Sequence, residues 1–225
     1  MIKKGSQIVC ESLLREGCEV IFGIPGGAIL PLYQALPEYP ELRHILTRHE
    51  QGASLAADGY ARVTGKPGVA FATSGPGATN LVTGIASAQM DSVPLVIVTG
   101  QVNSWTIGSD AFQETDITGI TLPVTKHNFL VMDASEIASS IKEAFHIANS
   151  GRPGPVLVDI PRNVFVQEVE YEEPGELNLP GYSPNFSGHP GQIRKAANLI
   201  NESEKPVIIA GHGVIISKAY DELKE

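Results

Sequence analysis

Hydrophobic and polar residues follow two periods along this 225-residue chain. Apolar residues three to four positions apart, as at Ile8, Val9 and Leu13, favour helices, and short continuous apolar runs are typical of buried strands. The pattern predicts helices over residues 4–16, 28–36, 53–63, 78–89, 136–148 and 192–201, and the start of another after residue 213. It predicts strands over residues 19–24, 42–47, 69–73, 94–99, 156–160 and 206–210, and a polar, irregular functional loop over residues 101–122.

The regular alternation of strands and helices predicts an α/β fold with a mainly parallel sheet and right-handed crossovers. Residues 167–190 are acidic and rich in proline, which is typical of a linker. We therefore expect a first domain over residues 1–165, a linker over 166–190, and the truncated start of a second, Rossmann-like domain over 191–225. A single βα unit cannot bury its own faces, so this last part is expected to be incomplete.

Composition and charge narrow the classes of function. The net charge of −9 and the lack of a basic run argue against nucleic acid or an anionic membrane as partner. No apolar run approaches the roughly 20 residues of a membrane span. Cys10 and Cys18 fit neither a disulfide framework nor a metal pair and are expected to be buried free thiols. With no apolar segment after the first basic residues, the sequence predicts a cytoplasmic protein.

Three chemically notable segments each follow a predicted strand. Glu50 follows the strand over residues 42–47, and glycine-rich turns over 23–27 and 74–80 follow two others. Because the carboxyl ends of parallel strands meet at one edge of the sheet, these segments are expected to face one crevice. A buried acid beside exposed backbone suits a ring-shaped ligand. Taken alone, Glu50 is better explained as a solvated residue that favours the positive end of a helix dipole.

The common cofactor motifs are absent. There is no phosphate-binding GxxxxGK[ST] run, and Gly75-x-Gly77 and Gly211-x-Gly213 are followed by Asn80 and Ile216 where a dinucleotide fingerprint requires a small residue. Each of these glycine pairs alone indicates only a tight βα turn. The histidines show no metal-binding spacing, so no metal site is predicted.

Eight motifs, in order over residues 1–165, resemble the thiamine diphosphate enzymes of the acetolactate (acetohydroxyacid) synthase family. Any one of them is weak, but together at these spacings they are highly specific. They are Phe22-Gly23-Ile24-Pro25-Gly26-Gly27, Arg48-His49-Glu50-Gln51-Gly52-Ala53, Ala57-Asp58-Gly59-Tyr60-Ala61-Arg62, Ser74-Gly75-Pro76-Gly77-Ala78-Thr79-Asn80, Gly100-Gln101-Val102, Asp110-Ala111-Phe112-Gln113-Glu114, Thr125-Lys126-His127-Asn128 and Gly154-Pro155-Val156.

The resemblance implies the cofactor and the residues that meet it. In this family the residue matching Glu50 bonds to N1′ of the thiamine diphosphate aminopyrimidine. In a mostly apolar cleft the neutral carboxyl would be favoured, and the resemblance implies that this acid favours the ring's imino tautomer. Residues 1–165 would be the pyrimidine-binding domain. The cofactor-binding residues would be Pro25, Gly26, Glu50, Ser74, Gly75, Gly77 and Asn80, and the catalytic residues Glu50, Gly27, Phe112 and Gln113.

The resemblance also implies the substrates. Gln101, Phe112, Gln113 and Arg162 would contact pyruvate and a second 2-keto acid. Related decarboxylases tend to carry a histidine pair where this chain has Phe112 and Gln113, so condensation is favoured over release of an aldehyde. Two features depart from the family. Arg162 replaces a lysine that many members carry, and residues 103–105 (Asn-Ser-Trp) replace a proline followed by basic residues.

The expected function is that of the N-terminal part of an acetolactate synthase, a transferase of branched-chain amino acid biosynthesis, inactive by itself. In the family Mg²⁺ and the diphosphate bind a C-terminal domain and FAD binds mostly the central domain, so neither site is expected here. The whole enzyme would be a homo-oligomer, with a small regulatory subunit as a further candidate partner. Two alternatives stay open: the pyrimidine-domain subunit of a two-chain 2-keto acid decarboxylase, and a non-catalytic remnant or binding module.

Overall fold

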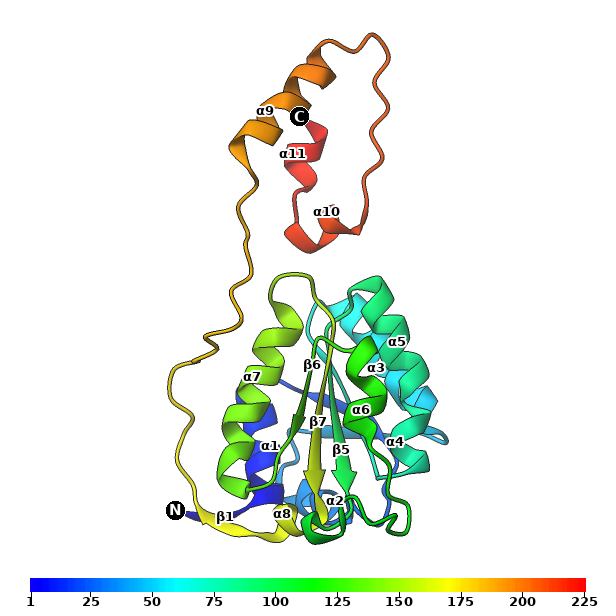
Figure 1. Ribbon diagram of the computed structural model, residues 1–225, viewed down its shortest axis with the longest axis vertical. Helices are drawn as coiled ribbons and strands as arrows, with labels where there is room; N and C mark the ends of the chain where they lie inside the picture. The colour runs from blue at the N-terminus through cyan, green and yellow to red at the C-terminus, as the bar shows by residue number, and fades with distance from the viewer. The chain divides into compact units, whose positions relative to one another are not determined.

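The computed structural model describes residues 1–225, which form two compact units, residues 1–184 and residues 185–225. The first unit contains a six-stranded, fully parallel sheet in the order β3-β2-β4-β5-β7-β6. Three of its strands, β6, β7 and β5, lie side by side in Figure 1. The predicted α/β fold with a parallel sheet is therefore confirmed. The strands are β2 (Val20–Gly23), β3 (Arg43–Leu46), β4 (Gly68–Ala72), β5 (Leu95–Gln101), β6 (His127–Leu130) and β7 (Pro155–Pro161).

Helices cover both faces of this sheet. On one face α1 (Gly5–Arg15) and α7 (Ile137–Asn149) pack side by side, with α2 (Leu30–Ala35) against α1. On the other face α3 (Glu50–Thr64) and α5 (Val82–Asp91) pack together (Figure 1). Each face has its own buried cluster, and the clusters are joined by strands whose successive side chains point to opposite faces.

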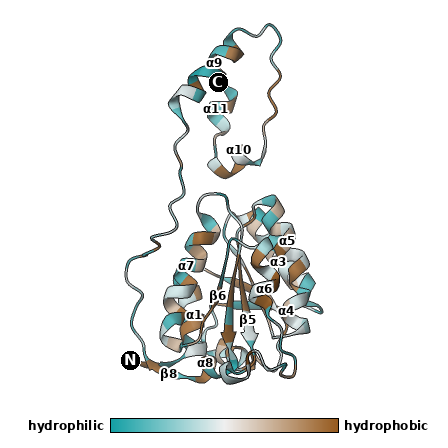
Figure 2. Ribbon diagram, viewed as in Figure 1, coloured by the Kyte–Doolittle hydropathy of each residue, from teal (hydrophilic) through white to brown (hydrophobic).

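The central strands are buried along their whole length. Every residue of β4, β5 and β7 is buried. In Figure 2 the strands at the centre of the first unit are largely brown, whereas its helices mix brown and teal. Small residues let α3 and α5 approach closely, since a Cβ on Gly84 would lie 2.2 Å from Ser54 Oγ. The carboxyl ends of β2, β4, β5 and β7 meet at one edge, where α2 and α8 (Arg162–Val166) also lie (Figure 1).

Residues 168–184 are attached to the first unit. A short strand, β8 (Glu168–Glu170), pairs antiparallel with β1 (Ile2–Lys4). Farther along, Tyr182 Oη lies 3.0 Å from Lys126 Nζ and donates to Ser150 O at 2.9 Å. The acidic composition of this segment thus accompanies specific contacts with α1 and α7. The predicted domain boundaries at residues 165 and 190 stay predictions.

Three secondary-structure predictions were wrong in part. No strand forms over residues 206–210, because no other strand pairs with it and its backbone hydrogen-bonding groups find no ladder. The helix expected over 78–89 is two helices, α4 (Pro76–Asn80) and α5, which meet where Leu81 N donates to Ala78 O. The segment expected to be irregular contains the end of β5, the turn η2 (Ser104–Thr106) and α6 (Ile117–Thr121).

Several short elements have no clear sequence signal. They are β1, β6, β8, α8 and four 3₁₀ turns: η1 (Leu36–Glu38), η2, η3 (Leu122–Val124) and η4 (Ala134–Glu136). The second unit consists of α9 (Pro190–Asn201), α10 (His212–Ser217) and α11 (Tyr220–Lys224). None of the helices in the structure combines the length and the apolar character that crossing a bilayer requires.

Candidate functional site

Glu50 is the first residue of α3 and lies at the carboxyl edge of the sheet. The helix begins because His49, in extended conformation, accepts a hydrogen bond from Gln51 N on its Nδ1 atom at 3.1 Å. The expectation that Glu50 is buried was wrong, because its side chain is partly exposed at the start of α3. Its Oε2 accepts a hydrogen bond from Asn80 Nδ2 at 2.9 Å. This bond joins the first turn of α3 to α4. It therefore connects the motif that contains Glu50 with the glycine-rich motif that contains Asn80.

Thr73 lies between the two glycine-rich turns and holds them together. Its Oγ1 accepts a hydrogen bond from Ala28 N at 3.1 Å. A Cβ on Gly26 would lie 2.5 Å from Thr73 Cβ, and one on Gly77 would lie 2.8 Å from Thr73 Cγ2. These two glycines are therefore required by Thr73, which sequence reasoning missed. The sequence signal that could have identified Thr73 is its position immediately after a buried strand.

The turns leave one side of Glu50 lined by backbone. A Cβ on Gly77 would lie 3.4 Å from Glu50 Oε1, and that oxygen accepts no hydrogen bond from the chain. A Cβ on Gly27 would meet nothing within 4 Å. The site thus offers a carboxyl oxygen with a free lone pair and glycine backbone that a flat ring can approach. This donor set fits an aminopyrimidine, whose ring nitrogen pairs with a carboxyl group.

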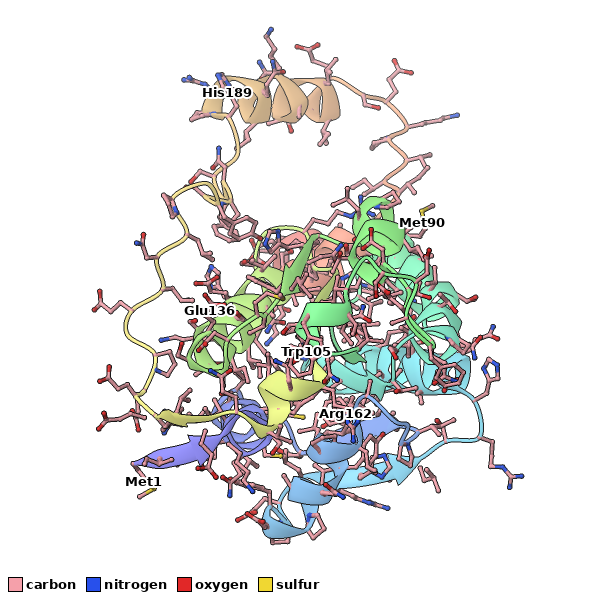
Figure 3. All side chains as sticks on the ribbon, turned by 60° about the horizontal axis from the view of Figure 1, so that its bottom comes forward. Met1, Met90, Trp105, Glu136, Arg162 and His189 are labelled. Atoms are coloured by element: carbon pink, nitrogen blue, oxygen red, sulfur yellow. The ribbon has the colours of Figure 1, made fainter.

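A cavity of about 370 Å³ opens at the same edge of the sheet. Phe112 is 88% exposed, and α8, which carries Arg162, contacts the turn η2, which carries Trp105. Figure 3 shows Trp105 and Arg162 near each other at this edge. The structure therefore brings together most of the predicted substrate residues. The cavity is lined by Gly27, Ala28, Leu30, Ser74, Val102, Asn103, Thr106, Ala111, Phe112, Gln113 and Arg162.

Gln101 is the predicted substrate residue that the structure does not place in the cavity. It is 4% exposed, and its amide is fully used within the chain. Its Nε2 donates to Thr115 O and to Asp159 Oδ2, both at 2.9 Å, and its Oε1 accepts from Val102 N. In this arrangement Gln101 fixes the beginning and the end of the loop that carries Phe112.

Asp159 is a buried acid that sequence reasoning missed. It is 1% exposed on β7 and accepts hydrogen bonds from Thr99 Oγ1 at 2.6 Å and from Gln101 Nε2. Burial outweighs these two donors and raises the pKa of Asp159 to about 7. A charged residue inside an apolar strand was the signal that could have found it, because such residues are rarely buried without partners.

The remaining predicted cofactor-binding residues lie in the two glycine-rich turns. Ser74 is buried beside the cavity, and Gly75 adopts a positive φ of 61°. Pro25 is exposed at the tip of the first turn.

Cys10 and Cys18 are buried free thiols, as predicted. The structure gathers no group of three His, Cys, Asp or Glu side chains suited to a metal ion.

Comparison with known proteins identifies the class. Residues 3–120 match the family described as thiamine pyrophosphate enzyme, N-terminal TPP binding domain, and the chain belongs to this family. The six-stranded parallel sheet of the α/β fold is consistent with this N-terminal domain.

Within the family the chain is similar to acetolactate synthases. It is 57% identical over 221 residues to the acetolactate synthase of Mycobacterium bovis, 54% over 220 residues to the acetolactate synthase large subunit of Corynebacterium glutamicum, and 52% over 226 residues to the acetolactate synthase of Arthrospira platensis. Each comparison covers 98% of this chain. The chain spans 36%, 35% and 39% of the length of these relatives, respectively.

Proposed function

We propose that this chain forms the part of an acetolactate synthase large subunit that binds the aminopyrimidine half of thiamine diphosphate. The observation that carries the proposal is the Glu50 carboxylate, held by Asn80 beside the glycine-lined edge at Gly77. When bound, thiamine diphosphate supplies the carbon nucleophile and the electron sink for decarboxylation of a 2-keto acid. Identity of 52–57% to acetolactate synthases over nearly the whole chain supports condensation as the outcome.

Glu50 would exchange a proton with the pyrimidine ring nitrogen. Its Oε1 is the oxygen without a partner in the chain, while Asn80 keeps Oε2 in place. A side chain fixed in this way can act as a general acid and base, an effect typically worth about 10²–10⁴-fold in rate. We assign cofactor contacts to Pro25, Gly26, Ser74, Gly75 and Gly77 through their backbone at the same edge. Gly27 would supply backbone on the side that faces the cavity.

The cavity would receive the keto acids. Arg162 offers a guanidinium for a substrate carboxylate, and Phe112 and Gln113 line the same space. No histidine lines the cavity, so no imidazole is placed there to protonate a carbanion. This arrangement supports attack on a second keto acid over release of an aldehyde. Gln101 would act on the reaction through the loop it anchors.

The remaining cofactors and partners belong to the same proposal. We infer that Mg²⁺, the diphosphate and FAD bind parts of the subunit outside residues 1–225. A homo-oligomer is supported by large apolar side chains exposed on α3 and α5, where Val63 is 88% and Met90 77% exposed. Met90 is labelled in Figure 3. We also propose a small regulatory subunit as a candidate partner and a cytoplasmic location. The two free thiols support the location.

A chimera tests the function. This chain would replace the matching N-terminal residues of the Corynebacterium glutamicum relative, to which it is 54% identical. With thiamine diphosphate, Mg²⁺, FAD and pyruvate, we expect acetolactate. Acetaldehyde and CO₂ as main products would favour the decarboxylase alternative, and a folded, inactive chimera would favour a binding module. Glu50→Gln in the chimera controls for activity that does not pass through this site.

The isolated chain gives a second test. Calorimetric titration of residues 1–225 with thiamine diphosphate and Mg²⁺ should show absent or millimolar binding, because only the pyrimidine half of the site is proposed here. Micromolar binding would show that the chain itself holds a diphosphate site and would contradict this part of the proposal.

A further inference from the structure

The loop that carries Phe112 is closed around a carboxylate. One Glu114 carboxylate oxygen accepts a hydrogen bond from Gly108 N, and the other accepts from Ala111 N at 2.8 Å. Glu114 N in turn donates to Ala111 O at 2.9 Å. These converging backbone N–H groups favour the charged carboxylate and lower the pKa of Glu114. The turn over residues 108–114 is thus closed on the side chain of its own last residue.

The backbone of this turn is one that needs such support. Asp110 and Gln113 both have a φ of +57°, in the left-handed region that side chains disfavour. Strained conformations of this kind persist only where surrounding contacts determine them. Phe112 lies between the two and is 88% exposed, so packing in a core does not hold it. The Glu114 hydrogen bonds are therefore the main contacts that fix the turn from inside.

Contacts outside the turn place it against the site. A Cβ on Gly75 would lie 2.6 Å from Gln113 O, so the turn rests directly on the backbone of the second glycine-rich segment. At the base of the loop, Gln101 Nε2 donates to Thr115 O. Ser109 N and Oγ also donate to Thr106 O, at 3.1 and 2.6 Å. The base and one side of the turn are thus held by contacts with residues outside 108–114.

We propose that Glu114 is a positioning residue, whose carboxylate fixes residues 108–114 so that Phe112 and Gln113 face the cavity beside Arg162. What Phe112 and Gln113 then contact rests on the proposed function. The closure of the turn by Glu114 does not rest on it. Glu114 acts through its neighbours, because it does not itself line the cavity.

Hydrogen exchange on residues 1–225 tests the closure directly. The backbone amides of Gly108 and Ala111 should be protected from exchange. Glu114→Gln should reduce their protection at least tenfold, because the glutamine side-chain NH₂ group would face one of the two backbone N–H donors and cannot accept its hydrogen bond. Asp110→Asn is the matched control. It removes a charge from the same turn, asparagine tolerates positive φ, and Asp110 makes no side-chain hydrogen bond in the structure. Unchanged protection in Glu114→Gln, or equal loss in Asp110→Asn, would overturn the proposal.

A functional measurement in the chimera separates positioning from general destabilisation. Glu114→Gln should raise the KM for pyruvate and the share of acetaldehyde several-fold, with an unchanged thermal midpoint. Glu114→Asp should restore part of both effects. A wild-type product ratio in an active Glu114→Gln chimera would overturn the positioning role. A wild-type chimera that makes no acetolactate would instead contradict the proposed function, and the exchange experiment would still decide whether Glu114 closes the turn.

Discussion

Asn80 and Glu50, thirty residues apart in sequence, are joined by a hydrogen bond of 2.9 Å from Nδ2 to Oε2. The bond connects α4 to the first turn of α3. It therefore links, through their side chains, the motif that contains Glu50 and the glycine-rich motif that contains Asn80. One carboxylate oxygen is thereby fixed, while the other faces Gly77 and accepts no bond from the chain. The pair gives the carboxylate a defined direction at the carboxyl edge of the sheet.

Removal of the Glu50 acid should abolish cofactor activation. In the chimera, Glu50→Gln should slow proton exchange at the thiazolium carbon of thiamine diphosphate by about 10²–10⁴-fold, since the amide cannot transfer the proton. The exchange can be followed by NMR in D₂O. Glu19→Gln is the matched control, because Glu19 pairs with Lys66 on the surface. An exchange rate in Glu50→Gln equal to that of the control would remove Glu50 from the mechanism.

Asn80 should act through Glu50. Asn80→Ala removes the donor that orients the carboxylate and should slow the same exchange by about 10–10²-fold, the rate equivalent of the ~1.5–3 kcal/mol of a hydrogen bond to a charged group. Because both residues serve one carboxylate, the double variant Glu50→Gln, Asn80→Ala should be no slower than Glu50→Gln alone. Additive losses in this cycle would mean that Asn80 contributes independently of Glu50.

Asp159 should make the stability of the chain depend on pH. Burial raises its pKa from 3.8 to about 7, so between these values the folded chain keeps a proton that the unfolded chain releases. Its contribution to stability is therefore complete at low pH and declines as pH rises toward 7. The decline should approach about 1.4 kcal/mol per pH unit within that window. Urea unfolding at pH 4.5, 5.5 and 6.5 measures it.

Asp159→Asn provides the comparison for this pH dependence. Asparagine does not titrate, so the unfolding free energy of the wild type should fall relative to that of the variant as pH rises. A difference that stays constant from pH 4.5 to 6.5 would show that Asp159 keeps an ordinary pKa despite its burial.

Gly75 should not tolerate a side chain. Its φ is +61°, and a Cβ would lie 2.6 Å from Gln113 O, so Gly75→Ala combines backbone strain with a clash against backbone. We expect a loss of about 1–3 kcal/mol in unfolding free energy, measured by chemical denaturation. Gly59→Ala in α3 is the control: its Cβ would meet nothing within 4 Å and should stabilise the helix by about 0.5–1 kcal/mol. Equal stability of both variants would contradict the close approach of Gln113.

Most of the fold could be predicted from periodicity. The strands β2, β3, β4, β5 and β7 and the helices α1, α3 and α7 are present within a few residues of their expected bounds. Edge strand β6 gave no signal, because it is half exposed and lacks a continuous apolar run. The strand expected over residues 206–210 had the right composition but no partner, and pairing lies outside any local pattern.

The candidate site divides in the same way. The motifs themselves indicated Glu50, the glycine-rich turns and Phe112, because residue type and position after a strand carry that information. Thr73 and Asp159 were missed, since their roles consist of contacts with residues about 45 and 60 positions away. Gln101 was predicted to meet substrate, whereas the structure shows its amide bonded to Asp159, Thr115 and Val102.

The sequence by itself determined the parallel α/β architecture, the edge at which the site lies and the family to which the chain belongs. Local periodicity and spaced motifs suffice for these, because strand direction and βα handedness follow from short-range chain geometry. Only the tertiary structure decided which oxygen of Glu50 is held, that Thr73 joins the two turns, and that Glu114 closes the loop around Phe112. Those facts depend on atoms that folding brings within hydrogen-bond distance, and no linear pattern encodes such distances.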